Sequence, residues 1–269
     1  MKKLTKLLFT VFLFIACINP VSALGDISVT KDNGVYHIIL KGERIKKKIK
    51  FVVSEDLITN REAHIRGRSG LTINAGYFDP NNAKTISYIV TDRMISGDPM
   101  FNSSLLANPY FRKNMNKILN RSEFRVMECG NKREYAIVSH KSEVPFGCAT
   151  ETSAQGGPLI LPELRLEEEG FIVKNDKGEV IRESSKVLHK TARTIIGIKG
   201  TDECHILIIT DENPMDLYEV QKLCKELKLD RAMAFDGGSS TSLNYKDIEV
   251  ISTEDSDTGR MLKSFMILQ

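Results

Sequence analysis

Residues 205–241 read HILIIT-DENPM-DLYEVQKLCKELKL-DRAMAF-DGGSST. Apolar side chains run continuously, then recur at helical spacing, then run continuously again, which predicts a strand over 205–210, a helix over 215–228 and a second strand over 231–235. If the two strands are parallel neighbours, their C-terminal ends lie at one edge of a sheet, where such sheets bind ligands. That arrangement would bring Asp211 close to Asp236.

The second strand runs into a turn of six polar or small residues: Asp236, Gly237, Gly238, Ser239, Ser240 and Thr241. One carboxylate, two glycines whose backbone carries no side chain, and three hydroxyls are therefore consecutive in the chain. Such a set suits a charged or highly oxygenated ligand, and we interpret the turn as the rim of a site. An ordinary tight hairpin turn with polar filler is the alternative.

The rest of the chain is rich in short strand-like runs separated by Gly, Asn, Asp and Pro. These runs cover residues 34–40, 49–54, 71–74, 86–91, 124–128, 135–139 and 194–198. We therefore expect an α+β fold in a single domain over residues 24–269. Its mixed, mainly antiparallel sheet should pack against a few helices and include the C-terminal strand-helix-strand unit.

The first 23 residues have the charged, apolar and small-residue zones of a secretory signal peptide, and the apolar zone is too short for a membrane span. We expect export to a secreted or periplasmic location. Lipoprotein anchoring at Cys17 is a minor alternative. The chain has 38 basic and 35 acidic residues, and the leader holds three of the lysines, so residues 24–269 are formally neutral. Nothing in this balance indicates a nucleic-acid partner.

Four cysteines follow the leader, which permits two disulfides in an oxidising compartment. We favour a bond between Cys129 and Cys148, because both flank a predicted hairpin. Cys204 and Cys224 form a second bond or remain as buried thiols. None of the cysteines has CxxC spacing and none of the five histidines has metal-ligand spacing, so no metal site is predicted.

Three further polar segments are candidates for the site. Asn74, Gly76, Phe78 and Asp79 follow an apolar strand, but a turn capped by its own Asn and Asp is the competing interpretation. Gly156 and Gly157 allow backbone to approach a ligand closely. Arg193 and Thr194 begin a strand, and a guanidinium there suits an oxyanion, with a surface salt bridge as the alternative.

Taken in order, the motifs of this chain resemble the phosphodiester glycosidase family. The matching positions are Asn74, Gly76 and Phe78; Gly156, Gly157 and Pro158; Arg193, Thr194 and Gly197; Asp236 to Ser240; and, near the last strand, Arg260 with 266–268. The resemblance runs from about residue 71 to 269. Departures are Ala75 and Tyr77 within the first motif, and a stretch over 94–121 that looks like an insertion near the site.

The resemblance implies an exported glycosidase that cleaves a sugar-1-phosphodiester, of the N-acetylglucosamine-1-phosphodiester type, into free sugar and phosphomonoester. Asp236 would be the nucleophile or the base for water, and Arg193 would stabilise charge on the phosphate. Asn74 and Asp211 would orient the reacting groups. Substrate-binding roles would fall to Gly76, Phe78, Asp79, Gly156, Gly157, Thr194, Gly237, Gly238, Ser239 and Ser240.

Two other functions fit the same residues. Asp211, Asp236 and Asn74 could hold a divalent cation in a metal-dependent phosphodiesterase, although the main hypothesis needs no cofactor. An exported glycan-binding protein without catalysis would also keep these loops. The expected partner in each case is a glycan or glycosyl phosphate. The oligomeric state cannot be inferred from the sequence.

Overall fold

The computed structural model describes residues 20–24, 27–252 and 258–269. Nearly all of the predicted leader, including Cys17, lies outside the described residues. Residues 20–23, which we assigned to the leader, form most of strand β1 and pair with β2 in the structure. In the part of the chain described, none of the helices has the length and apolarity to cross a bilayer.

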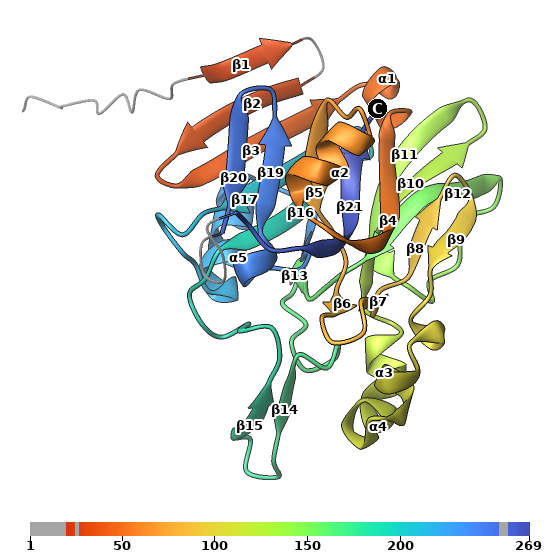
Figure 1. Cartoon of the computed structure of the whole chain (residues 1–269), viewed down its shortest axis with the longest axis vertical. Helices are drawn as coiled ribbons and strands as arrows, with labels where there is room; N and C mark the ends of the chain where they lie inside the picture. Colours follow the sequence, from red (N-terminus) through yellow and green to blue (C-terminus); the bar gives the residue numbers. More distant parts are fainter. Residues whose placement is uncertain (1–19, 25–26, 253–257) are drawn as a thin grey trace, which may run out of the picture.

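Three antiparallel sheets make up the body of the molecule (Figure 1). Sheet A has the order β1 (Pro20–Leu24), β2 (Ile27–Asp32), β3 (Val35–Lys41), β17 (Glu203–Ile209), β16 (Arg193–Lys199), β18 (Arg231–Ala234) and β13 (Leu159–Leu161). Sheet B has the order β20 (Ile248–Ile251), β19 (Ser242–Tyr245), β5 (Leu71–Asn74), β21 (Leu262–Leu268) and β4 (Ile49–Ile58). Sheet C has the order β11 (Lys132–Ser139), β10 (Ser122–Cys129), β12 (Cys148–Gln155), β8 (Ile89–Thr91) and β9 (Met94–Gly97).

Two small hairpins and a few short helices complete the fold, so the α+β prediction is confirmed. The hairpins are β6 (Phe78–Asp79) with β7 (Lys84–Thr85), and β14 (Ile172–Lys174) with β15 (Val180–Glu183). The helices are α1 (Glu43–Lys46), α2 (Asn60–Arg66), α3 (Ser103–Ala107), α4 (Pro109–Ile118) and α5 (Leu217–Glu226), with 3₁₀ turns η1 (Pro99–Phe101) and η2 (Gly238–Ser240).

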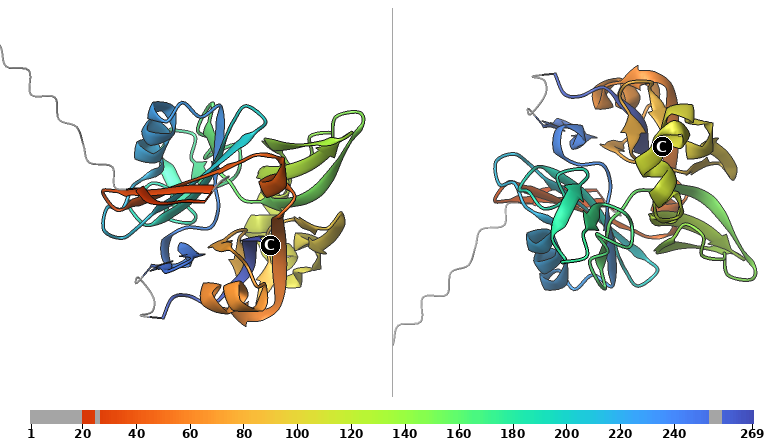
Figure 2. Two further views of the ribbon diagram at one scale, coloured as in Figure 1. Left: turned by 90° about the horizontal axis from the view of Figure 1, so that it is seen from above. Right: turned by 90° about the horizontal axis from the view of Figure 1, so that it is seen from below.

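The main core lies where the three sheets meet, and Figure 2 shows them on different sides of it. Phe51 of sheet B packs edge-on against Phe124 of sheet C and against Phe235, which follows the last residue of β18 in sheet A. The ring centroids are 6.0 and 5.8 Å apart. These rings are fully buried. Because each fully buried aromatic side chain contributes roughly 2 kcal/mol or more, this junction links the three sheets strongly.

Helices α5 and α2 cover the outer faces of two sheets. Helix α5 begins at a capping box, in which Asp216 accepts from the amide of Glu219 and the Glu219 side chain accepts from the amide of Asp216. Its Leu217, Val220 and Cys224 are buried against the apolar side chains of sheet A. Helix α2 begins with a second capping box at Thr59 and packs on sheet B.

The predicted strand-helix-strand unit is present as β17, α5 and β18, but its two strands are not neighbours. Strand β16 lies between them and pairs antiparallel with both. The two strands therefore point the same way while separated by a third, because the backbone of Ile195 to Ile198 bonds to β17 on one side and to β18 on the other. The expected adjacency was wrong, and the consequence for Asp211 is described below.

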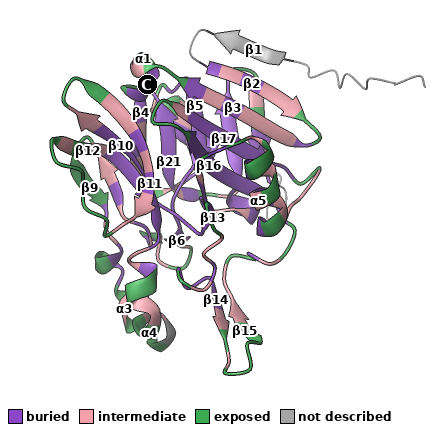
Figure 3. Cartoon of the chain, turned by 180° about the vertical axis from the view of Figure 1, so that it is seen from behind, coloured by how far each residue is buried: buried purple, intermediate pink, exposed green. Residues whose placement is uncertain are grey.

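The disulfide between Cys129 and Cys148 is present, as predicted. These cysteines face each other across the paired ends of β10 and β12. Cys204 and Cys224 are buried free thiols, which settles the alternative left open by the sequence. Figure 3 shows that burial concentrates in the strands of the sheets, whereas α3, α4 and the β14–β15 hairpin are the more exposed parts at one end of the molecule.

Candidate active site

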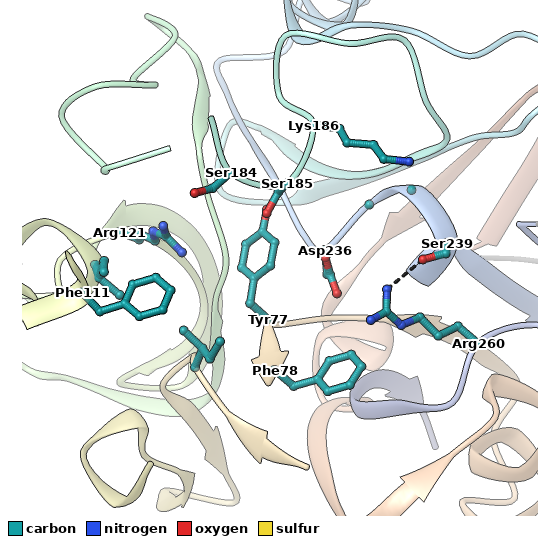
Figure 4. Close-up of a pocket in the computed structure, with 14 residues that line it drawn as sticks. Tyr77, Phe78, Phe111, Arg121, Ser184, Ser185, Lys186, Asp236, Ser239 and Arg260 are labelled. Atoms are coloured by element: carbon teal, nitrogen blue, oxygen red, sulfur yellow. Dashed lines mark hydrogen bonds between the residues drawn. The ribbon is translucent and has the colours of Figure 1, made fainter. Parts of the chain in front are cut away.

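A pocket of about 360 Å³ is lined in part by residues of α4 and of the segment after β15, two elements that Figure 1 shows at the same end of the molecule. Six segments far apart in the sequence supply its walls. The lining residues are Tyr77 and Phe78; Ile86; Phe111, Ile118 and Arg121; Ser184 to Lys186; Asp236 to Ser239; and Arg260. Figure 4 shows Asp236, Ser239 and Arg260 on one side of the Tyr77 ring and Phe111 and Arg121 on the other.

Asp236 enters the pocket directly after β18, and contacts from sheet B fix its backbone. Its amide donates to the carbonyl of Ala75 over 3.0 Å, and the Asn74 side-chain amide donates to its carbonyl over 2.5 Å. The Ser240 hydroxyl donates to the carboxylate over 2.7 Å. Two contacts therefore hold the backbone of Asp236 and a third holds its carboxylate, which also lines the pocket.

Asn74 acts through this backbone rather than at the pocket wall. Its carbonyl oxygen accepts from the hydroxyl of Thr194 over 2.7 Å and from the amide of Ser242 over 3.1 Å. The side chain is 1% exposed and does not line the pocket. Asn74, Thr194 and Ser240 are therefore residues that position Asp236.

The glycines of the turn have a structural requirement of their own. Gly238 has φ of 59°, which favours glycine, and its amide donates to the carbonyl of Ala192 over 2.8 Å. Gly237 passes so close to the same carbonyl that an added Cβ would lie 3.2 Å from it. Both line the pocket, so backbone without a side chain reaches it.

Burial dominates the electrostatics of Asp236. Burial raises the pKa of this carboxyl to about 6, against the opposing effects of the Ser240 hydroxyl, the Arg260 charge and the Gly237 amide. Arg260 itself donates to the Ser239 hydroxyl over 2.8 Å, and its guanidinium lies 5.3 Å from the centre of the Phe78 ring. The carboxylate thus has a cation beside it and a pKa close to neutrality.

Arg121 and Lys186 add positive charge to the lining. Arg121 is 7% exposed; its guanidinium stacks 3.9 Å from the centre of the Phe171 ring, and its Nε donates to the carbonyl of Glu169 over 2.9 Å. Burial raises the pKa of the Tyr77 hydroxyl well above its ordinary range, and the Asp236 charge adds to this effect. That hydroxyl donates to the carbonyl of Gly157 over 2.9 Å and remains neutral.

Arg193 does not line the pocket, contrary to the expected phosphate clamp. Its guanidinium donates to the backbone carbonyls of Ser185, Lys186, His189 and Met215 at distances from 2.6 to 3.5 Å. The residue is 4% exposed. Arg193 therefore holds the loop that carries Ser184 to Lys186 to the pocket, and the arginine beside the carboxylate is Arg260.

Three predicted substrate-binding glycines pack against protein instead of lining the pocket. A Cβ at Gly156 would lie 2.5 Å from the carbonyl oxygen of Ala234, and one at Gly76 would lie 2.6 Å from the Cβ of Ser87. A Cβ at Gly157 would overlap the buried Glu169 carboxyl. These glycines leave room for a neighbouring backbone at Gly156 and for neighbouring side chains at Gly76 and Gly157, which is the structural reason for their presence.

The two other predicted acids also lie outside the lining of this pocket. Asp79 accepts from the amide of Asn81 over 2.9 Å and caps the turn of the β6–β7 hairpin, as the competing interpretation held. Asp211 lines a separate hollow with Tyr36 and Glu249. Because β16 separates β17 from β18, the ends of those strands do not bring Asp211 into the pocket.

Most of the remaining lining was missed by sequence reasoning. Ile86, Ser184, Ser185 and Lys186 carry no motif that marks them. The 94–121 stretch did give a signal as an insertion near the site, and it supplies Phe111, Ile118 and Arg121. Among the residues described, no three or more His, Cys, Asp and Glu side chains are grouped to hold a metal ion.

A family model described as phosphodiester glycosidase matches residues 68–268. The chain belongs to the phosphodiester glycosidase family. The resemblance drawn from the order of the motifs is thereby confirmed. No curated protein sequence matches the chain significantly.

Solved structures with the same fold are distant in sequence. The catalytic domain of zebrafish N-acetylglucosamine-1-phosphodiester alpha-N-acetylglucosaminidase, auto-inhibited by its pro-peptide, superposes with a TM-score of 0.61 at 14% identity, over 90% of this chain and 81% of that chain. A Burkholderia pseudomallei protein described as a proposed exported protein superposes with a TM-score of 0.61 at 11% sequence identity, over 90% of this chain and 74% of that chain. A hypothetical protein from Synechocystis superposes with a TM-score of 0.56 at 12% sequence identity, over 93% of this chain and 61% of that chain. At these identities the likeness concerns the fold alone.

Proposed function

We propose that the protein is an exported hydrolase that cleaves a sugar-1-phosphodiester to a free sugar and a phosphomonoester. The observation that carries this proposal is the charge pattern of the pocket. Among the described residues that line it, Asp236 is the sole carboxylate, and it lies with three cations, Arg121, Lys186 and Arg260.

A single carboxylate suits a phosphate leaving group. Ordinary glycosidases use two carboxyl groups, because one must protonate the departing alcohol. A phosphodiester oxygen leaves without a proton, so the second acid is dispensable, and cations that stabilise the developing dianion replace it. Family membership supports the same class of reaction.

The roles follow from position. Asp236 either attacks the anomeric carbon, forming a glycosyl ester that water then hydrolyses to free sugar, or takes the proton of a water that attacks this carbon. The bond between that carbon and the phosphate oxygen breaks, and its electron pair stays on the phosphate. Arg260 stabilises that charge, while Ser239 binds Arg260 and faces the same space.

Export rests on the leader-like first 23 residues and on the disulfide between Cys129 and Cys148, since disulfides persist in oxidising compartments. The substrate type, an N-acetylglucosamine-1-phosphodiester, rests on the resemblance of the motifs. Processing of the amino terminus can be read by mass spectrometry of the exported protein.

The test is release of phosphomonoester from the methyl diester of N-acetylglucosamine 1-phosphate. Asp236→Asn should fold and lose at least about a hundredfold in kcat/KM, because a well-placed acid or base contributes that much. Asp211→Asn is the matched control and should stay within about twofold of wild type, since Asp211 lines another hollow. A folded Asp236→Asn variant with full rate would contradict the proposal.

The same assay distinguishes the two alternative functions, a glycan-binding protein and a metal-dependent phosphodiesterase. A glycan-binding protein would bind the diester without turnover in any variant. A metal-dependent phosphodiesterase would lose activity on chelation and regain it with added cation. The geometry argues against the metal-dependent phosphodiesterase, because Asn74 bonds to backbone and to Thr194 and because Asp211 lies outside the pocket.

A further inference from the structure

The pocket has two chemically different ends. The carboxylate end is formed by Asp236, Ser239 and Arg260, and the apolar end by Phe111 and Ile118 with Arg121 beside them. Figure 4 shows Tyr77 between the Asp236 side and the Phe111 side. A phosphodiester joins two groups through one anion, so a site for it needs two compartments with cations between.

The apolar end is built rather than incidental. Phe111 and Ile118 are seven residues apart on α4 and so share one helix face. The guanidinium of Arg182, from the β14–β15 hairpin, lies 5.5 Å from the centre of the Phe111 ring, so hairpin and helix contact each other there. Ile118 is 1% exposed, whereas Phe111 is half-buried and keeps part of its ring accessible.

Arg121 marks the inner border of the apolar end. It is held by the Phe171 ring and by the Glu169 carbonyl, so its guanidinium is fixed before any ligand arrives. With Arg260 at the other end, two arginines flank the middle of the pocket. An anion between them would place one ester group against Asp236 and the other against Phe111.

We propose that the apolar end is the subsite for the group on the far side of the phosphate, and that this group is aromatic or bulky and aliphatic. This inference rests on the proposed function and names the substrate class of the same site. The phosphate binds between Arg121 and Arg260, the sugar lies at Asp236, and the leaving phosphomonoester carries the apolar group.

Two diesters of N-acetylglucosamine 1-phosphate test the proposal, one with methanol and one with benzyl alcohol. Wild type should show about tenfold or more higher kcat/KM for the benzyl diester, because a ring buried against Phe111 and Ile118 leaves water. Phe111→Ala should reduce this preference to about threefold or less, and Phe111→Leu should restore part of it.

Phe101→Ala is the matched control. Phe101 is 76% exposed and lines a different hollow, so this variant should keep the wild-type preference. Equal kcat/KM for the two diesters in wild type would overturn the subsite. An equal loss on both diesters in Phe111→Ala would overturn it too, because the ring would then serve the sugar or the fold.

Binding of benzyl phosphate and methyl phosphate, measured by calorimetry, separates this inference from the proposed function. Tighter binding of benzyl phosphate that Phe111→Ala abolishes would support the subsite even if neither diester is hydrolysed, and only the proposed function would then fail. Equal affinity for the two phosphates, or no binding of either, would overturn the subsite.

Discussion

Burial and the neighbouring polar groups shift the pKa of Asp236 in opposite directions. Burial favours the neutral acid, whereas Ser240, Arg260 and the Gly237 amide favour the carboxylate, and burial outweighs them. Its pKa of about 6 lies above the ordinary 3.8. A group with a raised acid pKa in the folded state binds its proton more tightly there than in the unfolded chain, so it destabilises the fold once deprotonated.

The first prediction follows from that sign. As pH rises from about 4 to about 7, wild type should lose up to about 3 kcal/mol of unfolding free energy that Asp236→Asn does not lose. Denaturant unfolding of both proteins at pH 4.5 and pH 8 measures the difference. The kcat/KM of wild type should decrease as the pH falls below about 6, the pKa of Asp236, because the reaction uses the carboxylate.

Asp211→Asn provides the control for this prediction, since it removes another acid and leaves Asp236 with its partners in place. A stability gap between wild type and Asp236→Asn that is the same at both pH values would contradict the raised pKa. A flat rate profile between pH 5 and pH 8 would contradict the use of the carboxylate.

Residue-level reasoning found the groups that sit in one contiguous turn. Asp236 and the following glycines and serines share a local motif, and local order in the chain is visible in the sequence. The sequence does not distinguish an arginine that contacts a ligand from one that donates to four backbone carbonyls, as Arg193 does. Which of these occurs depends on the loop over 184–190, whose position is set by tertiary packing.

At the scale of elements, that loop depends on Arg193. Replacing Arg193 with Ala removes the donor to four partly buried backbone carbonyls, which should cost about 1–3 kcal/mol of stability. The amides of 184–190 should exchange hydrogen faster, and kcat/KM should fall by similar factors for a phosphodiester and for a glycoside with a neutral leaving group. Exchange mass spectrometry and the two assays measure these effects.

Arg61→Ala is the control for the Arg193 variant, because Arg61 is exposed and pairs with Glu249 on the surface. It should change neither exchange over 184–190 nor activity. A selective loss on the phosphodiester in Arg193→Ala, with unchanged exchange in the loop, would restore the direct phosphate clamp.

Elements were predicted well where periodicity is local and poorly where pairing is distant. Strands β16, β17 and β18 and helix α5 were each recognised from apolar spacing. Their order in the sheet was not, because the hydrogen bonds of Ile195 to Ile198 join segments up to about 40 residues apart and leave no local pattern.

At the scale of the whole molecule, the site lies where sheets A and B meet. Asn74, the last residue of β5 in sheet B, and Ala75, which follows it, bond to Asp236, and Asn74 also bonds to Thr194 of sheet A. The pocket lining then draws on sheet C through the segment that leads from β9 to β10. The position of the carboxylate is therefore a property of the packed sheets and not of its turn alone.

The last prediction concerns Asn74, whose loss should lower stability and activity together. Asn74→Ala leaves the Thr194 hydroxyl and the Ser242 amide without their acceptor in a buried site, at a cost of about 2–4 kcal/mol, and releases the backbone of Asp236. We expect kcat/KM to fall at least about tenfold, because small displacements of a catalytic group are costly.

At pH 8, Asp236→Asn should instead lose activity while gaining stability. Asn244→Ala, which removes a buried bond from β19 of sheet B to Asn60 of α2, should lose stability alone. Denaturant unfolding and diester hydrolysis, measured on all three variants, test this contrast, and a folded Asn74→Ala variant with full rate would refute it.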